Sequence, residues 1–179
     1  MRFLDREDAG QKLGQALIKY EKTPAVVIGI PRGGLVVAAQ VAERLHAPLD
    51  VVVPRKIGAP HNEEIAIGAV GQDGTILRDA RTIDLLGLSD TQIREMADRV
   101  LTEISRRTTL YRGGRLGEEL RDKVVIVVDD GIATGFTVEA ALVSIRNSLP
   151  RTLVLAVPVA PPDTVERLRQ LVDEMVCLV

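Results

Sequence analysis

The sequence predicts an α/β fold in which an open, mostly parallel, doubly wound sheet carries helices on both faces, with a small hairpin added. Runs of aliphatic residues recur along the chain and are apolar throughout, which is typical of parallel strands buried on both faces. They lie at residues 25–30, 49–54, 124–128 and 152–159. Helical patterns alternate with these runs. With 179 residues, of which 46% are hydrophobic, we expect one domain over residues 1–179.

The first third of the chain alternates helix and strand. Residues 5–21 have a helical pattern with Asp5 as N-cap, and Leu13, Leu17 and Ile18 share one face. A strand over 25–30 leads through Pro-Arg-Gly-Gly into a helix that ends near residue 45, and a second strand follows. Residues 55–65 are polar and contain Gly58 and Pro60, so this stretch is predicted to be a loop.

The remaining elements follow the same reasoning. The segments AIGAV and TILRD predict a small hairpin around Gly71–Gly74. A long helix is expected from Asp90, capped by Ser89 or Asp90, because apolar residues recur there at steps of three or four. After the strand at 124–128, the sequence predicts a helix, a strand, a helix and a short last strand. These span residues 138–147, 152–159, 163–172 and 174–179.

The amino-acid composition disfavours several classes of function. The net charge is −2, with 23 basic and 25 acidic residues, which disfavours a nonspecific nucleic-acid binder. Phe3, Tyr20, Tyr111 and Phe136 are the only aromatic residues, so few side chains can stack on a base. No apolar run reaches the length of a membrane span, and the charged N-terminus does not resemble a signal peptide.

The single cysteine, Cys177, excludes a disulfide within the chain. It lies in a hydrophobic run, so we expect a small buried apolar residue rather than a nucleophile. This cysteine usage fits a reducing compartment, and we expect a cytoplasmic protein that does not bind membranes.

In an open parallel sheet, ligands bind beyond the carboxyl ends of the strands. The stretch VVIVVDDGIATGFT places Asp129 and Asp130 at such an end. Two adjacent carboxylates can accept hydrogen bonds from a sugar diol and can hold Mg²⁺, directly or through water. The loop at 131–137 can direct backbone N–H groups at a phosphate, with a helix N-terminus behind it. The alternative is that the acids merely end a strand and the glycines serve a turn.

This stretch resembles the phosphoribosyl-pyrophosphate (PRPP) motif of type I phosphoribosyltransferases. The combination with PRGG and RK-x-GAP-x-N-x-E is most similar to bacterial phosphoribosyltransferases of unassigned substrate. The resemblance implies that Asp129 and Asp130 bind the ribose hydroxyls and Mg²⁺ and act in catalysis. It also implies a loop for the 5-phosphate, formed by Ile132, Ala133, Thr134, Gly135, Phe136 and Thr137. Phe136 departs from the small residue of many members, and we expect it to pack at the helix start.

Two further loops complete the resemblance. Arg32, Gly33 and Gly34 of PRGG look like the diphosphate loop, where glycines allow close approach and the arginine donates charge-assisted hydrogen bonds. Arg55 and Lys56 resemble catalytic cations of the family's mobile loop, which would meet diphosphate oxygens. His61 and Glu63 are either general bases or ordinary polar loop residues.

The acceptor half of the site is harder to interpret. Members of the family choose their base with a variable hood, which here would come from the N-terminal segment or from the hairpin near 65–80. Leu4, Ile67 and Val70 are candidates by location alone. Similar chains often continue past the last strand, whereas this one stops at Val179.

The resemblance implies transfer of a phosphoribosyl group from PRPP with Mg²⁺, release of diphosphate, and a nucleobase or related N-heterocycle as acceptor. It also implies a homodimer, since dimers are common in the family, and no nucleic-acid partner. One alternative is a regulator that binds PRPP without catalysis. Another is an unrelated α/β phosphosugar protein that mimics the motif.

Overall fold

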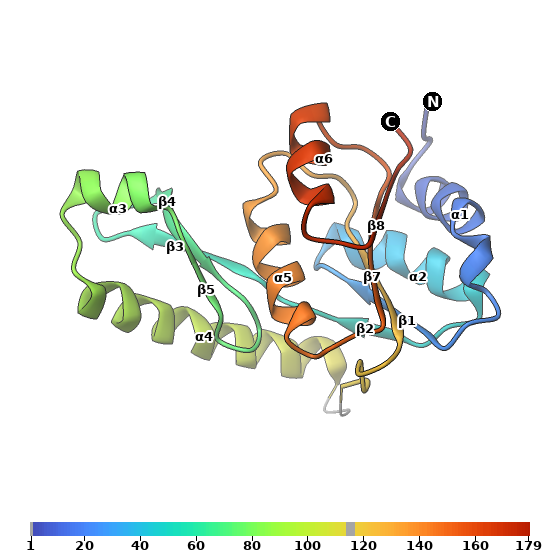
Figure 1. Cartoon of the computed structure of the whole chain (residues 1–179), viewed down its shortest axis with the longest axis horizontal. Helices are drawn as coiled ribbons and strands as arrows, with labels where there is room; N and C mark the ends of the chain where they lie inside the picture. Colours follow the sequence, from blue (N-terminus) through green and yellow to red (C-terminus); the bar gives the residue numbers. More distant parts are fainter. Residues whose placement is uncertain (1, 114–116) are drawn as a thin grey trace.

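The computed structural model describes residues 2–113 and 117–179, which form a parallel sheet of five strands and an antiparallel sheet of three. The parallel sheet has the order β2-β1-β6-β7-β8, and every neighbouring pair is parallel. Its strands are β1 (Ala25–Gly29), β2 (Leu49–Val51), β6 (Val124–Val128), β7 (Thr152–Val157) and β8 (Glu174–Cys177). The predicted α/β architecture is therefore confirmed (Figure 1).

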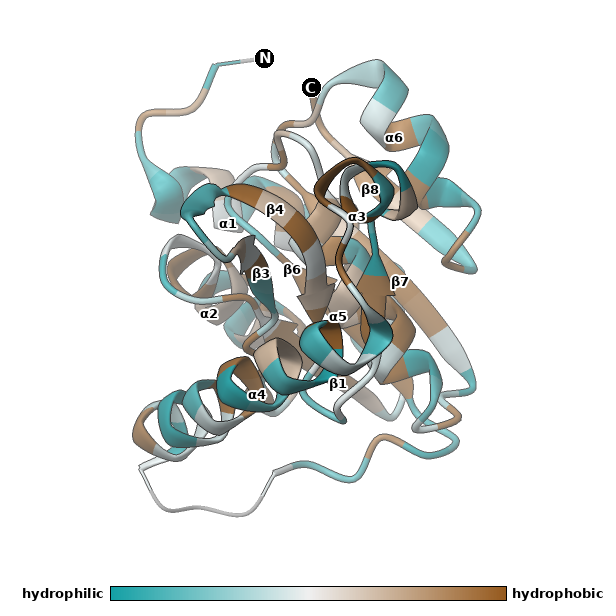
Figure 2. Ribbon diagram, turned by 90° about the vertical axis from the view of Figure 1, so that its left-hand side faces the viewer, coloured by the Kyte–Doolittle hydropathy of each residue, from teal (hydrophilic) through white to brown (hydrophobic). Residues whose placement is uncertain are grey.

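Helices cover both faces of this sheet. α1 (Arg6–Ala16) and α2 (Gly33–Leu45) pack on one face, and α5 (Phe136–Arg146) and α6 (Pro162–Arg169) on the other. Alternate residues of β6 serve the two faces: Ile126 packs with α1 and α2, whereas Val127 packs with α5 and α6. The strands consequently have apolar side chains on both sides. In Figure 2, brown ribbon, which marks hydrophobic residues, lies at the centre of the molecule.

The strand order places the expected ligand crevice between β1 and β6. From β1 the chain passes to β2 on one side, and it later returns on the other side of β1 as β6. Such a reversal opens a crevice beyond the carboxyl ends of the two central strands. The two ends are tied together, since Ile30 N–H donates to the Val128 carbonyl at 2.9 Å.

Residues 55–112 form an arm that projects from the body of the molecule to the left of Figure 1. It contains β3 (Arg55–Ala59), β4 (Asn62–Val70), β5 (Ile76–Arg78), α3 (Ala80–Leu86) and α4 (Asp90–Arg112). Ile57, Ile67, Ile93 and Ile104 of the arm are fully buried in a core that also includes Val51 of β2. Polar contacts help to attach the arm to the body: Arg112 pairs with Asp50, and the Asn147 amide, after α5, donates to Asp73 and to Thr75.

The prediction of a loop over residues 55–65 was wrong, because this stretch forms the hairpin of β3 and β4. Gly58 and Pro60 indicated a loop, but Gly58 lies at a register shift in the paired strands. A Cβ at Gly58 would lie 2.7 Å from Glu63 Cα, so the bulge requires glycine. Pro60 follows in the turn.

Some of the other predicted elements are confirmed, and others differ from the structure. The hairpin around Gly71–Gly74 is confirmed as β4 and β5, and α4 begins with a Ser89 capping box as expected. The first helix ends at Ala16 and is followed by a short 3₁₀ helix, Ile18–Tyr20. Helix α3, capped by Asp79 and ended by Gly87, was not predicted.

The environment of Cys177 and the lengths of the helices bear on two further predictions. Cys177 is half-buried at the edge of the sheet rather than fully buried, and its thiol donates to the Val179 carbonyl. Among the helices of the described ranges, none is both long and apolar enough to cross a membrane.

Candidate functional site

Asp129 and Asp130 follow β6 directly and occupy the crevice between β1 and β6. The Asp130 N–H donates to Asp129 Oδ1 at 2.8 Å, which holds the Asp129 carboxylate against the backbone. Burial, together with the neighbouring Asp130 carboxylate, raises the pKa of Asp129 to about 7. The two carboxylates are therefore held side by side although their charges repel each other. A binding site for a cation or a diol would require this arrangement.

Gly33 and Gly34, at the start of α2, lie against this acid pair. A Cβ added at Gly33 would be 2.0 Å from Asp130 Oδ2, and one at Gly34 would be 2.8 Å from Asp129 Oδ1. Only glycine lets the helix N-terminus approach the carboxylates this closely. The structure thus brings the predicted diphosphate loop and the predicted ribose acids together. The peptide bond between Pro31 and Arg32 in this loop is cis.

Arg6 also reaches the acid pair, although no sequence pattern indicated it. Its Nε lies 2.7 Å from Asp130 Oδ2, across 124 positions of sequence. Arg6 is the first residue of α1, so the N-terminal segment borders the crevice. A contact between residues so distant in sequence leaves no local signal, and only the packing of α1 on the body explains it.

The predicted 5-phosphate loop joins Asp130 to α5. Ile132 is buried beneath it, Ala133 and Thr134 are exposed, and Gly135 precedes the helix with a φ of 73°. Phe136 is half-buried as the first residue of α5, in agreement with the expected packing at the helix start. The N–H groups in the first turn of a helix have no partner within that helix, so this N-terminus is suited to a phosphate.

Helix α6 holds the outer side of this loop. Thr164 Oγ1 donates to the Ala133 carbonyl at 3.0 Å, and the Arg167 guanidinium donates to the Thr134 carbonyl. Arg167 also pairs with Glu139 in the first turn of α5. Because two successive carbonyls are fixed toward α6, the loop conformation is set before any ligand arrives. Sequence reasoning did not assign a role to either residue of α6.

We expect Thr164→Val to weaken phosphate binding without unfolding the protein. The variant keeps the side-chain shape but removes the hydrogen bond to Ala133, which is worth about 1 kcal/mol, or roughly fivefold in affinity. Affinities for ribose 5-phosphate and for PRPP should fall together, as calorimetry would measure. Glu166→Gln, an exposed neighbour on α6, is the control. Equal affinities in Thr164→Val and the parent would show that α6 does not position the loop.

A cleft of about 870 Å³ lies beside the acid pair, between β3 and α4. The residues of the diphosphate and phosphate loops that line it are Pro31, Arg32 and Thr137. The predicted cations Arg55 and Lys56 line the same cleft as Arg32. Asp129 and Asp130 do not line this cleft. Gly33 lies against Asp130 and directly follows Arg32, so it connects the lining of the cleft to the acid pair.

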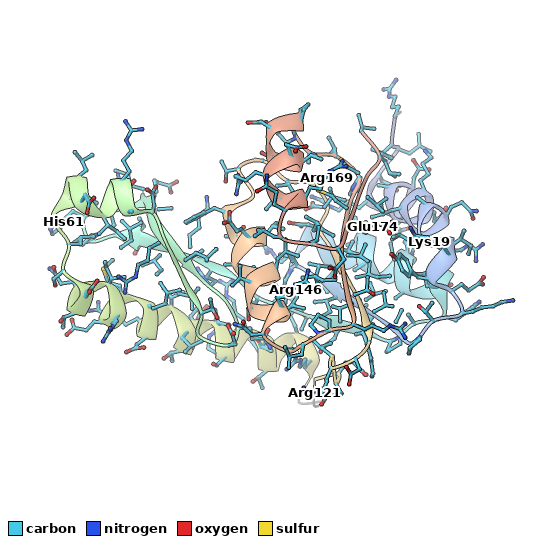
Figure 3. The ribbon with its side chains drawn as sticks, viewed as in Figure 1. Lys19, His61, Arg121, Arg146, Arg169 and Glu174 are labelled. Atoms are coloured by element: carbon cyan, nitrogen blue, oxygen red, sulfur yellow. The ribbon has the colours of Figure 1, made fainter. Side chains whose placement is uncertain are left out.

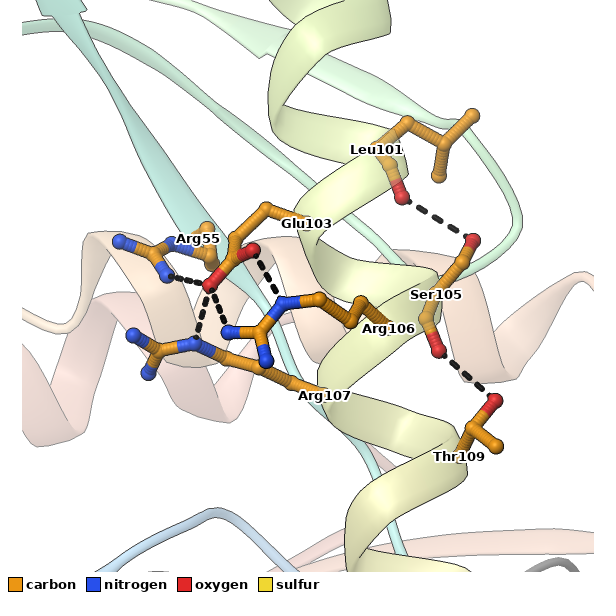
Figure 4. Close-up of polar contacts among 7 residues, drawn as sticks. All are labelled: Arg55, Leu101, Glu103, Ser105, Arg106, Arg107 and Thr109. Carbon is orange, nitrogen blue, oxygen red and sulfur yellow. Dashed lines mark hydrogen bonds and ion pairs between the residues drawn. The ribbon is translucent and has the colours of Figure 1, made fainter.

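The cleft is rich in cations. It is lined by Arg32, Arg55, Lys56, Arg99 and Arg107, together with the carboxylates of Glu63, Glu95 and Glu103. Figure 4 shows that Glu103 binds three guanidinium groups, those of Arg55, Arg106 and Arg107. Its pKa is lowered to about 2, chiefly by the hydrogen bonds from Arg106 and Arg107. Lys56 has no ion-pair partner within the described ranges, and its ammonium group is therefore available to an anion.

Comparison with known proteins identifies the family of this chain. A family model described as "Phosphoribosyl transferase domain" matches residues 4–179, which is nearly the whole chain. The chain belongs to this family. The phosphoribosyltransferase domain thus includes both the acid pair and the arm.

Relatives of known sequence and structure agree with this assignment. A protein of Mycobacterium tuberculosis (strain H37Rv) named "Putative phosphoribosyl transferase Rv0571c" is 42% identical over 176 residues. These residues are 98% of this chain and 40% of that protein, so the chain spans less than half of its curated relative. The crystal structure of the protein TT1426 from Thermus thermophilus has 43% identity and a TM-score of 0.81, covering 99% of this chain and 84% of that one.

A more distant solved structure shares the fold alone. The purine phosphoribosyltransferase from Pyrococcus horikoshii is 20% identical, with a TM-score of 0.56 over 99% of this chain and 84% of that one.

Within this phosphoribosyltransferase domain, several candidate residues lie away from the acid pair. Figure 3 places His61 at the tip of the arm, far from the body of the molecule, whereas Glu63 lines the cleft. Ile67 and Val70 are 0% and 1% exposed in the core of the arm, so the expectation that they contact an acceptor was wrong. Leu4 is 88% exposed in the N-terminal segment. Tyr111, which was not assigned a role, lines the cleft.

Proposed function

We propose that this protein transfers the 5-phosphoribosyl group of PRPP to a ring nitrogen of a nucleobase or related N-heterocycle. The C1′–N bond forms, the C1′–O bond to diphosphate breaks, and the acceptor nitrogen loses its proton. One observation carries the proposal: the acid pair lies between two helix N-termini, those of α2 and α5. A ligand with a diol between two phosphate groups fits this arrangement, and PRPP has that chemistry.

Each group of the site has a distinct role in this proposal. Asp129 and Asp130 hold the ribose hydroxyls and stabilise the positive charge that develops at C1′. The loop from Ile132 to Thr137 binds the 5-phosphate, and Arg32 with Gly33 and Gly34 binds the diphosphate. Arg55 and Lys56, from the cleft, stabilise the departing diphosphate as its charge increases.

The residues present fit the Mg²⁺ that such a reaction uses. Within the described ranges, no cluster of three or more His, Cys, Asp or Glu residues could enclose a metal. Mg²⁺ is commonly held by one or two carboxylates together with substrate phosphates and water. Asp129 and Asp130 would supply the carboxylates, and the ion, when bound, would neutralise charge on the diphosphate.

The direct test is an assay of purified protein with PRPP, Mg²⁺ and a panel of purine, pyrimidine and pyridine bases. Release of diphosphate that depends on one base would identify the acceptor and support the proposal. PRPP binding by calorimetry without diphosphate release from any base would instead indicate a regulator. If PRPP does not bind, the protein only resembles a PRPP enzyme.

We expect Lys56→Ala to lower turnover more than PRPP affinity. A cation that meets the leaving diphosphate stabilises the transition state more than the ground state, so its loss should reduce kcat by about 100-fold. PRPP affinity should change by less than roughly threefold, since the other cations of the diphosphate subsite remain. Lys22→Ala, an exposed lysine outside the cleft, is the control. Unchanged kcat would remove Lys56 from the mechanism.

A further inference from the structure

Arg6 lies at the junction of two subsites of the proposed donor site. Its Nε donates to Asp130 Oδ2 at 2.7 Å, and it would be 2.8 Å from a Cβ placed on Gly33. Asp130 belongs to the ribose subsite, and Gly33 to the diphosphate loop. The guanidinium is therefore placed where the bond between ribose C1′ and the diphosphate would lie.

The main chain at Arg6 is anchored, which argues against a chance contact of a loose terminus. Asp5 caps α1 by accepting from the Asp8 N–H at 2.8 Å, and Leu4 N–H donates to the Asp8 carboxylate at 3.0 Å. Lys12 holds the same carboxylate at 2.7 Å. Arg6 is thus presented from the first turn of a capped helix.

Packing of α1 on α2 then fixes Arg6 relative to the diphosphate loop. A Cβ at Gly10 would lie 2.7 Å from Gln40 Cβ, so the two helices approach closely only because this residue is glycine. Leu13 and Leu17 are fully buried in the same interface. Since α2 begins at Gly33, this interface sets the position of Arg6 against the residue that approaches Asp130.

Most of the donors of Arg6 are unused by the protein. A guanidinium carries five N–H groups, and the hydrogen bond to Asp130 uses one. The side chain makes no other hydrogen bond or ion pair within the described ranges, and it is 61% exposed. The fork of N–H groups is therefore free to bind phosphate oxygens, the ligand that its geometry suits.

We infer that Arg6 is a further catalytic residue of this domain, one that binds the diphosphate of PRPP beside C1′ while its Nε keeps Asp130 in place. This inference rests on the proposed function. It assigns the N-terminal segment to the donor half of the site, where it adds a further cation. The guanidinium would stabilise the oxygen that takes the bonding electrons when the C1′–O bond breaks.

The test compares two ligands in two variants. Arg6→Met removes the guanidinium, and Arg6→Lys keeps the charge without the fork. Arg94→Met removes an exposed arginine from the outer face of α4 and is the matched control. Calorimetry would measure affinity for PRPP with Mg²⁺ and for ribose 5-phosphate, which lacks the diphosphate. Thermal unfolding would confirm that all variants fold.

We expect Arg6→Met to weaken PRPP binding at least tenfold more than it weakens ribose 5-phosphate binding, and Arg6→Lys to weaken PRPP binding less. A role limited to ordering Asp130 would weaken both ligands equally, and that result would overturn the inference. So would equal PRPP affinity in Arg6→Met and the parent. If the parent itself fails to bind PRPP, the proposed function fails, and the inference fails with it.

Discussion

Replacing Asp129 by asparagine should stabilise the protein at pH 8 while strongly weakening PRPP binding. Burial raises the pKa of Asp129 to about 7 in the folded state, whereas the unfolded value is 3.8. From about pH 4 to pH 7 the folded state holds a proton that the unfolded state has lost, so raising the pH lowers the free energy of unfolding. Asparagine removes this cost, and we expect a gain of at least about 1.4 kcal/mol at pH 8, the equivalent of one pKa unit.

The same substitution should cost PRPP affinity about 100-fold, because a charge-assisted acceptor for the ribose hydroxyls is lost. In the parent, PRPP affinity should decrease as the pH falls below about 7, since Asp129 then becomes protonated. Urea unfolding at pH 4 and pH 8, with calorimetry for PRPP, would check both parts. Asp98→Asn, on the exposed face of α4, is the control. A stability gain that persists at pH 4 would show that Asp129 is not the group responsible.

If Asp129→Asn stabilises the fold but weakens PRPP binding, Asp129 is a ligand-binding residue. An acid that merely ends a strand would not show these opposed effects. An acid that merely ended β6 could turn toward water and keep an ordinary pKa. Asp129 is instead held by the Asp130 N–H and by the close approach of Gly34. The protein maintains an unfavourable pair of carboxylates, and a bound cation or diol would relieve that cost.

Sequence reasoning predicted the parallel sheet because each of its central strands is apolar on both faces. Val124–Val128 must be buried on two sides, and the side chains of β6 divide between the two helical layers. Burial on both sides also indicates where the site lies, since polar residues that follow such a strand can face only the crevice. Asp129, Gly33 and the loop at 131–137 were selected as candidate site residues in this way.

The arm was harder to predict because β4 does not alternate between exposed and buried residues, and because its pairing with β3 contains a bulge. The first four residues of β4 are exposed and its last four are buried. Lys56 is exposed while Ile57 is buried, and the glycine between Ile57 and Ala59 resembles a loop signal. Contacts distant in sequence were also missed. Arg55 and Glu103 are 48 positions apart, and nothing in the local pattern links them.

Replacing Arg112 by leucine should destabilise the fold by about 2 kcal/mol, because it removes the ion pair that attaches the arm to the sheet. Arg112 donates from Nε and Nη2 to the two oxygens of Asp50, at 2.9 and 3.0 Å, and the Asp50 side chain is only 7% exposed. Leaving a buried carboxylate without its partner is costly. For a chain of this length the melting temperature should fall by roughly 4–8 °C.

The pH dependence of this loss identifies its cause. Burial raises the pKa of Asp50, but the hydrogen bonds from Arg112 and from the backbone outweigh it, and the net pKa is lowered. A lowered folded pKa contributes stability above the unfolded value of 3.8 and loses it as the pH falls. The difference between Arg112→Leu and the parent should therefore be largest near pH 7 and shrink below about pH 4. Arg94→Leu on the same helix should change little at either pH. A constant difference at both pH values would mean that Arg112 stabilises the arm by packing and not through its charge.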